Sequence, residues 1–257
     1  DDFRRHWIGT HFFNPPRYLR LLEIIPTTET DPSVVAAVTR VGDLLLGKGV
    51  VLAKDTPNFI GNHIALYGVA CLLKALATGQ YTIEEIDAIT GKAIGRPASA
   101  TFRTMDIAGV DVLAHVMRNL HERLPDPDDR AAFAVPEFLD QMVARGQLGE
   151  KAGKGFYQRR QSASGETEIW TLDHETFEYR PKQAVTIASI EAGRVMDDLA
   201  ERLRMLFHSR DKAGAFLRET LAPTLVYTAR VTPDIARSID DVDRVMQWGF
   251  GWELGPF

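Results

Sequence analysis

The sequence predicts a mainly α-helical fold, in which a truncated α/β piece is followed by two helical domains in tandem. Three observations predict it. Residues 1–55 show the order strand, strand, helix, strand, which is too short for a complete doubly wound α/β sheet. Beyond Pro57, apolar residues recur mostly at helical spacing. A stretch near the end of the chain also repeats the pattern of an earlier helix.

The α/β piece consists of four predicted segments. Residues 6–13 and 19–25 are short apolar runs that predict strands. Asp31 and Pro32 are typical of the N-cap and the first position of a helix, and apolar residues at helical spacing continue it. Residues 50–55 predict a return to strand.

Most of the remaining chain is expected to be helical. Predicted helices cover about 59–77, 82–94, 109–123, 136–145, 185–208, 212–230 and 234–248. Thr82 and Glu85 form the pattern of a capping box at one of these starts. Residues 161–183 are polar and irregular, which favours a linker that carries one short strand.

An internal repeat determines the expected domains. Residues 238–257 and 82–102 each begin with Ser or Thr, carry an acidic residue three positions on, and continue with Ile, Val and Gly. This predicts a duplication, although two unrelated capped helices would look similar. We therefore expect a remnant of a dinucleotide-binding α/β domain at 1–56, a helical domain at 57–160, a linker at 161–183 and a second helical repeat domain at 184–257.

Composition excludes several classes of protein. The chain of 257 residues has a net charge of −5, without the basic surface that is typical of nucleic-acid binding. The single cysteine, Cys71, excludes an intramolecular disulfide and a cysteine-based metal site, and it fits a cytoplasmic location. The longest apolar run, residues 64–73, is shorter than the roughly 20 residues of a membrane span. The chain starts without Met and ends on apolar residues, so we expect a fragment of a longer protein.

His11 and Glu23, in the predicted strands, are candidates for proton transfer. His11 lies where a strand meets a turn with two prolines, and imidazole accepts protons near neutral pH. Glu23 lies inside an apolar strand, where a carboxylate is costly unless it is paired. On adjacent strands, this carboxylate would orient the ring and stabilise its protonated form. The alternatives are a structural histidine and a glutamate that faces water.

Asn62, one turn into the first long helix, is a candidate donor to a carbonyl or hydroxyl group. The alternative is an asparagine that bonds to its own backbone. His63 and His115 are expected at surface or packing positions, without a predicted partner. The sequence contains neither GxGxxG nor GxxxxGK[ST], so a loop that holds a dinucleotide is expected to lie outside this chain.

Four segments, in order, resemble the signatures of the 3-hydroxyacyl-CoA dehydrogenases. They are GTHFFNPPRYLRLLEII, KDTPNFIGNHI, GRPASATFRTMDIAGVD and GQLGEKAGKGFYQR, between residues 9 and 159. The last stretch, DRVMQWGFGWELGPF, resembles the second helical repeat of the long, multifunctional members. The resemblance implies an oxidoreductase of fatty-acid β-oxidation that oxidises L-3-hydroxyacyl-CoA to 3-oxoacyl-CoA with NAD+.

The resemblance also implies roles for individual residues. His11 matches the catalytic base of the family, Glu23 its orienting carboxylate, and Asn62 the asparagine that contacts the substrate. NAD would be bound mainly by a Rossmann-type part that is missing, so this chain alone is not expected to turn over. Besides the acyl-CoA substrate, the suggested partners are a second copy of the chain in a homodimer, or a fused enoyl-CoA hydratase activity.

The sequence departs from the family pattern at four places, one of which is PASATF at residues 97–102 in place of P-M-G-P-F. Asn58 stands where Gly is usual, Gly61 where an apolar residue is usual, and His63 where Arg is usual, which leaves the acyl-chain preference open. Two other functions also remain open. The helical repeats could form an interaction or dimerisation module without catalysis, or the enzyme could act on a free 3-hydroxyacid.

Overall fold

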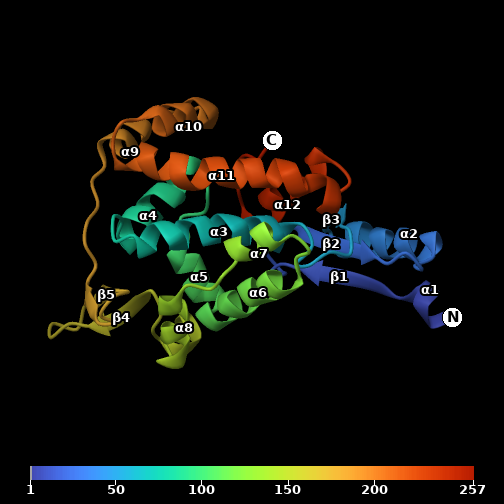
Figure 1. Cartoon of the computed structure of the whole chain (residues 1–257), viewed down its shortest axis with the longest axis horizontal. Helices are drawn as coiled ribbons and strands as arrows, with labels where there is room; N and C mark the ends of the chain where they lie inside the picture. The colour runs from blue at the N-terminus through green and yellow to red at the C-terminus, as the bar shows by residue number, and fades with distance from the viewer. Residues whose placement is uncertain (1) are drawn as a thin grey trace. The chain divides into compact units, whose positions relative to one another are not determined.

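The computed structural model describes residues 2–257, and the contacts within this part of the chain divide it into two compact units. Unit 1 contains the described residues up to Ala65 together with Thr224–Phe257, and unit 2 contains Leu66–Pro223. Figure 1 labels most of the helices and strands along the chain. Each unit is described by itself.

The elements of unit 1 come from both ends of the chain. They are α1 (Asp2–His6), β1 (Ile8–Phe12), β2 (Leu21–Pro26), α2 (Pro32–Arg40), the π-helix η1 (Val41–Leu45), β3 (Gly49–Leu52), the start of α3 (Gly61–Ala77), the end of α11 (Lys212–Ile235) and α12 (Ile239–Phe250).

Unit 2 contains the remainder of α3 and α11 and the elements between them. These are α4 (Ile83–Thr90), η2 (Lys92–Ile94), α5 (Phe102–Ala108), α6 (Val110–Arg123), α7 (Pro127–Ala132), α8 (Glu137–Ala144), η3 (Glu150–Ala152), β4 (Tyr157–Gln161), β5 (Thr167–Leu172), β6 (Tyr179–Pro181), α9 (Ala188–Gly193) and α10 (Leu199–His208).

The sheet of unit 1 has the strand order β1-β2-β3. The central strand β2 pairs antiparallel with β1 and parallel with β3. Residues 21–25 of β2 are all buried, as expected for a strand that is covered on both faces. Asp31 caps α2, since its side chain accepts a hydrogen bond from Ser33 N. The predicted order strand, strand, helix, strand is therefore confirmed for these residues.

Helix α12 packs against β2 and β3 and belongs to the core of unit 1. A Cβ added at Gly49 would lie 2.3 Å from Cε3 of Trp248 on this helix. One added at Gly249 would lie 2.7 Å from Cδ2 of Leu21. The glycines thus allow the helix to approach the strands closely. Buried side chains on this helix are Val242, Val245 and Met246.

The expected tandem arrangement of two helical domains is wrong. Thr224–Phe257 belong to unit 1, whereas residues 184–223 belong to unit 2, so the expected second domain does not stand by itself. The two matching segments do form capped helices, with Thr82 before α4 and Ser238 before α12. Caps and helical spacing are local properties, however, and the surface that a helix covers depends on distant residues. The expected boundaries at 56, 160 and 183 stay a proposal.

Unit 2 is helical and also carries an antiparallel sheet with the order β4-β5-β6. Its strands β5 and β6 lie in the segment that was expected to be a linker with one short strand, and β5 is that strand. Its strands are rich in polar residues and only partly buried, so their sequence lacks the apolar alternation of a core strand. The largest fully buried side chains of the unit are Phe102, Phe133, Phe156 and Phe216.

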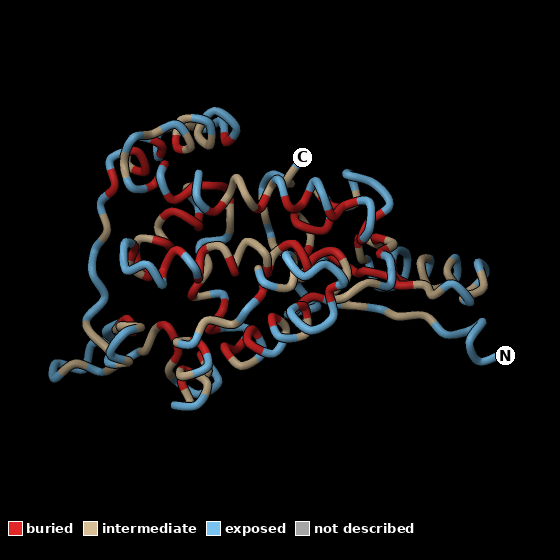
Figure 2. Tube along the Cα trace, viewed as in Figure 1, coloured by how far each residue is buried: buried red, intermediate tan, exposed pale blue. Residues whose placement is uncertain are grey.

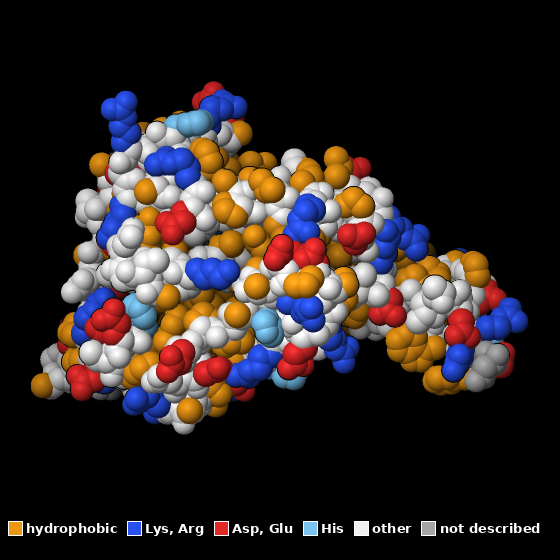
Figure 3. Space-filling model, in the orientation of Figure 1, with side chains coloured by type: hydrophobic (Ala, Val, Ile, Leu, Met, Phe, Trp, Pro, Cys, Tyr) orange, Lys and Arg blue, Asp and Glu red, His pale blue; other side chains and the backbone are white. Residues whose placement is uncertain are grey.

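Burial is uneven along unit 1. Figure 2 shows α2 in tan and pale blue, and no residue of this helix is buried. Large hydrophobic side chains are exposed in and just after η1, among them Leu44, Leu45 and Leu46. Figure 3 shows hydrophobic side chains, in orange, on the face of the molecule that is seen in this view. No helix within residues 2–257 is long and apolar enough to cross a membrane.

Candidate active site

Strands β1 and β2 place His11 and Glu23 opposite each other. The two strands run antiparallel, and their register pairs these two residues directly. Side chains of directly opposed residues project from the same face of a sheet and interact. Nδ1 of His11 lies 2.7 Å from Oε2 of Glu23. The contact predicted from the sequence is confirmed by this distance.

Glu23 is completely buried, with 0 % of its surface exposed. Its second oxygen, Oε1, accepts hydrogen bonds from Ile60 N at 3.1 Å and from Gly61 N at 3.0 Å. These amides lie at the start of α3, where backbone N–H groups lack partners inside the helix and favour an anion. A buried carboxylate is costly without such partners. Both oxygens of Glu23 are therefore satisfied, one by the imidazole and one by the helix start.

His11 turns its second ring nitrogen away from this carboxylate. Since the oxygen of Glu23 accepts, Nδ1 carries the proton, and the neutral ring keeps its lone pair on Nε2. The side chain of His11 is 26 % exposed. The rings of Phe13 and Phe59 flank it, with centroids at 4.5 and 5.6 Å. The imidazole is thus held against apolar rings and still reaches the surface.

A tight turn leads into α3. Asn58 and Phe59 have φ values of 61° and 53°, the left-handed region that non-glycine residues rarely adopt. Each such residue costs on the order of 1–3 kcal/mol. This turn is also why α3 begins at Gly61 and not at residue 59 as predicted. At Gly61, an added Cβ would lie 2.7 Å from Cζ of Phe13, so a larger side chain would not fit.

Asn62 follows Gly61 in the first turn of α3 and is half-buried. Within residues 2–257 it makes no hydrogen bond to His11 or Glu23. The structure therefore brings His11 and Glu23 together, and it places Asn62 next to the residue whose amide binds Glu23. The role of Asn62 stays a prediction.

His63, which was expected at a surface or packing position without a predicted partner, is a buried residue of unit 1 with hydrogen-bond partners. It is 3 % exposed, its Nδ1 lies 3.1 Å from the carbonyl oxygen of Pro57, and its Nε2 lies 2.6 Å from the hydroxyl of Tyr227. The two rings also stack, with centroids 5.7 Å apart. Tyr227 lies 164 residues further along the chain, so no local pattern could identify it. The one local signal was a histidine beside Asn62 at a helix start.

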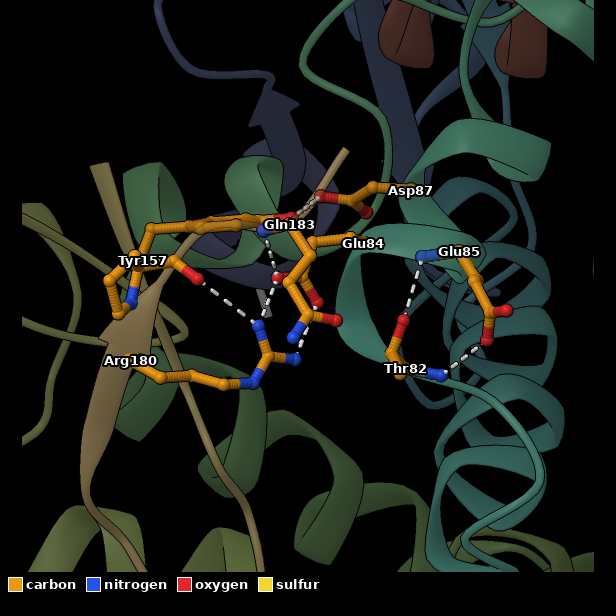
Figure 4. A network of polar contacts seen from close by, with 8 residues as sticks. Thr82, Glu84, Glu85, Asp87, Tyr157, Arg180 and Gln183 are labelled. Carbon is orange, nitrogen blue, oxygen red and sulfur yellow. Dashed lines mark hydrogen bonds and ion pairs between the residues drawn. The ribbon is translucent and has the colours of Figure 1, made fainter. Parts of the chain in front are cut away.

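A second polar cluster lies in unit 2, around Glu84 on α4. Figure 4 shows the guanidinium of Arg180 pointing at the carboxylate of Glu84. Its two nitrogens lie 2.6 and 3.0 Å from the two oxygens, and the backbone N–H of Gln183 donates to the same carboxylate at 3.1 Å. Burial alone would raise the pKa of Glu84, but Arg180 and the Gln183 N–H outweigh burial and lower that pKa.

Asp87 and Asp106 extend this cluster and connect two of the sequence motifs. Asp106, from the DIAGVD segment, accepts hydrogen bonds from Phe156 N and Tyr157 N at 2.8 Å each, in the GKGFY segment. The Tyr157 hydroxyl donates to Asp87 at 2.8 Å, and Asp87 also accepts from the backbone of residues 101–102. Loss of solvent raises the pKa of both aspartates to about 6. These bonds hold backbone segments together, so both motifs stabilise unit 2.

Two family models match successive parts of the chain. Residues 2–56 match the NAD binding domain of 3-hydroxyacyl-CoA dehydrogenase, and residues 59–159 match the C-terminal domain. The first match includes His11 and Glu23, and the second includes Asn62. The expected fold class is thus also wrong in describing residues 1–56 as a truncated remnant, and the expectation that the NAD-binding part is missing is not supported. Both expectations rested on the absence of a glycine-rich turn. This turn is only a short part of an NAD-binding domain.

Individual relatives match the whole chain or nearly all of it. A probable 3-hydroxyacyl-CoA dehydrogenase of Bacillus subtilis is 46 % identical over 257 residues, 100 % of this chain and 32 % of that protein. A putative fatty acid oxidation complex trifunctional enzyme of Rickettsia prowazekii is 27 % identical over 258 residues, 100 % of this chain and 34 % of that protein. The chain therefore spans about a third of the length of these curated relatives.

A solved structure shows the same fold. The crystal structure of 3-hydroxybutyryl-CoA dehydrogenase from Escherichia coli matches 97 % of this chain and 62 % of its own, with a TM-score of 0.60 and 19 % identity. At this identity, the likeness shows the fold alone. The two family models, by contrast, follow each other along the chain in the order of the sequence motifs. The chain belongs to the 3-hydroxyacyl-CoA dehydrogenase family.

Proposed function

We propose that the protein oxidises L-3-hydroxyacyl-CoA to 3-oxoacyl-CoA with NAD+, and that His11 is the base of this reaction. One observation carries the proposal. His11 Nδ1 lies 2.7 Å from the buried Glu23, in the segment that matches the family's NAD binding domain. Family membership supports the reaction type, and the contact supports the choice of base.

In this mechanism, Nε2 of His11 takes the proton from the substrate hydroxyl. NAD+, when bound, would supply the acceptor for the hydride of C3. Glu23 holds the Nδ1 proton, which fixes the tautomer of the ring, and it stabilises the imidazolium cation that forms. The amides of Ile60 and Gly61 keep this carboxylate in place. General-base assistance of this kind contributes on the order of 10²–10⁴ in rate.

The residues around His11 fit the end of NAD+ that would accept the hydride. The neutral imidazole offers a basic nitrogen beside the rings of Phe13 and Phe59, which exclude water from one side of it. No residue of this chain is proposed to hold the pyrophosphate, because the sequence contains no GxGxxG pattern. Asn62 is proposed to orient the hydroxyl or the thioester oxygen of the substrate.

Several earlier expectations stay predictions within this proposal. They are a role in fatty-acid β-oxidation, a cytoplasmic location, and inactivity of this chain when it is tested alone. A homodimer and a fused enoyl-CoA hydratase activity are further predictions of this kind. The match to a protein described as a trifunctional enzyme supports the second of these partners.

Substitution of His11 in the full-length protein tests the assignment of the base. His11→Gln keeps a polar side chain but removes the base, and we expect kcat to fall by about 10²–10⁴. The measurement is NADH formation from 3-hydroxybutyryl-CoA, with circular dichroism to confirm the fold. His115→Gln, at an exposed position on α6, is the matched control and should leave kcat unchanged. A near-normal kcat in His11→Gln rules out His11 as the base.

A comparison of substrates tests the reaction class. We expect kcat/KM to be far higher for 3-hydroxybutyryl-CoA than for free 3-hydroxybutyrate. Equal values would favour a dehydrogenase of free hydroxyacids. No NADH formation with either compound, together with self-association in light scattering, would favour the interaction module.

A further inference from the structure

We propose that His63 is a positioning residue that, together with Tyr227, holds the turn before α3 in the shape that presents two amides to Glu23. Its predicted effect on rate rests on the proposed function, whereas its effect on the geometry of the turn does not.

The turn needs contacts on both of its sides. Asn58 and Phe59 both have positive φ, and a turn of this kind persists only when its surroundings fix it. On one side, Glu23 binds the amides of Ile60 and Gly61. On the other side, the imidazole of His63 meets the carbonyl of Pro57, the residue just before the strained pair. Glu23 and His63 therefore hold opposite ends of one short segment.

The hydrogen bonds assign the tautomer of His63. The carbonyl oxygen of Pro57 can only accept, so Nδ1–H donates to it at 3.1 Å. In the neutral ring Nε2 is then an acceptor, and the Tyr227 hydroxyl donates to it at 2.6 Å. Both side chains are almost fully buried, at 3 % and 2 % exposure, and a buried polar group requires its partners. Tyr227 thus fixes the imidazole of His63, and this imidazole holds the turn at Pro57.

The result is a series of contacts from α11 to the proposed base. Tyr227 holds His63, and His63 holds Pro57. The turn after Pro57 delivers the amides that hold Glu23, which binds His11. Without the contact to Pro57, the strained turn can relax, and the hydrogen bonds from the helix start to Glu23 weaken. His63 acts through the turn, so it is not a catalytic residue.

Two isosteric substitutions separate this role from packing. In His63→Asn, the side-chain NH₂ stands near the position of Nδ1 and can still donate to the Pro57 carbonyl. In His63→Gln, the terminal amide stands near the position of Nε2, so it can meet Tyr227 but not Pro57. Hydrogen exchange of the Ile60 and Gly61 amides, measured by NMR on the chain, is the readout. We expect exchange at both amides to speed up about tenfold in His63→Gln, the effect of one lost hydrogen bond, but by no more than about threefold in His63→Asn, which loses only the contact with Tyr227.

Other amides provide the internal control. Exchange at Leu113 and Met117 on α6 of unit 2 should be unchanged in both variants. Equal acceleration at Ile60 in the two variants, or acceleration that extends to α6, would show a packing role and overturn the proposal. Tyr227→Phe, which keeps the ring and removes the hydroxyl, gives a milder version, for which we expect about a threefold acceleration. Unchanged exchange in Tyr227→Phe and His63→Gln alike would also overturn the proposal.

Kinetic measurements test whether the positioning role of His63 affects the rate of the reaction. In the full-length enzyme, His63→Gln should lower kcat with little change in KM, and His63→Asn should restore kcat. If the amide exchange follows the expected pattern while the wild-type protein forms no NADH, the positioning role stands and the proposed function fails. If NADH forms normally but kcat and exchange are both unaffected by His63→Gln, the proposed function stands and the positioning role fails.

Discussion

Unit 1 and unit 2 each bury carboxylates among backbone amides, but they leave different groups at the surface. In unit 1, Glu23 binds two amides and an imidazole, and that imidazole has a second nitrogen that faces away from it. In unit 2, Asp106 binds the amides of Phe156 and Tyr157, and Glu84 binds Arg180. The bonds of unit 2 link backbone segments, whereas in unit 1 the second nitrogen of the imidazole takes no part in the contact with Glu23.

This difference shows that a perturbed pKa does not by itself identify a catalytic site. Burial raises the pKa of Asp87 and Asp106 to about 6, yet both aspartates hold turns of the backbone. Shifted pKa values are often used to find active sites, although structural networks produce them too. In this chain, the more useful question is which buried carboxylate has a partner that can still accept a proton.

The largest effect that would test this comparison is expected for Glu23→Gln in the full-length protein. The amide nitrogen of glutamine cannot accept from the Nδ1–H of His11 or from the amides at the start of α3. We expect kcat for NADH formation to fall by about 10² or more. Glu84→Gln in unit 2 removes a carboxylate of similar burial and should leave kcat near wild type. Equal losses of kcat in the two variants would remove the distinction between the units.

The largest loss of stability is expected for Asp106→Ala. This change leaves the amides of Phe156 and Tyr157 without their acceptor. Each unpaired buried amide costs about 1–3 kcal/mol, so the free energy of unfolding should fall by about 2–6 kcal/mol in urea titrations. Glu150→Ala, which removes a surface partner of Arg103, is the control and should cost no more than about 1 kcal/mol. A loss as small as that of the control would mean that Asp106 is not structural.

A smaller effect should follow from crowding α12 against the sheet of unit 1. In Gly49→Ala, the new methyl group would collide with the ring of Trp248. Overpacking of this kind costs about 1–3 kcal/mol, which chemical denaturation can measure. The double variant with Trp248→Leu should lose less than the sum of the two single changes, because the ring that collides is gone. Additive losses would show that α12 does not pack on β3 as described.

The most gradual effect is expected in the pH dependence of stability. Asp87 has a pKa of about 6 in the folded chain and 3.8 ordinarily, so the folded state binds this proton more tightly than the unfolded state. Its contribution to the free energy of unfolding should therefore fall as the pH rises from about 4 to about 6, by at most about 1.4 kcal/mol per pH unit. Asp87→Asn cannot ionise and should lack this contribution. If the free energy of unfolding changes with pH in the same way in the wild type and in Asp87→Asn, the raised pKa of Asp87 is contradicted.

Local features of the sequence predicted much of unit 1. Alternation of side chains along two adjacent strands was enough to pair His11 with Glu23, and the pattern around Asp31 was enough to start α2. The amides that complete the Glu23 site were not predicted. They depend on positive φ at Asn58 and Phe59, and neither residue is a glycine that would indicate such a turn.

Contacts between distant segments explain what the sequence could not provide. The pairing of His63 with Tyr227, and of α12 with the sheet, joins residues from opposite ends of the chain. The capping residues Thr82 and Ser238 identified both helices of the repeat, but they carry no information about which core each helix covers. The one short strand that was expected between residues 161 and 183 corresponds to β5, whereas β4 and β6 were missed because their residues do not alternate between apolar and polar.

The register of β1 against β2 determines where insertions and deletions would keep the proposed base, His11, opposite Glu23. The separation of twelve positions from His11 to Glu23 is not what brings them together, because residues 13–20 form the connection and not the ladder. Insertions in that connection should leave the imidazole facing its carboxylate. A single deletion within Ile8–Phe12 would shift the strand by half a pleat and turn the ring to the opposite face. Related chains can thus be screened for an intact pair by strand phase instead of by the spacing between the two residues.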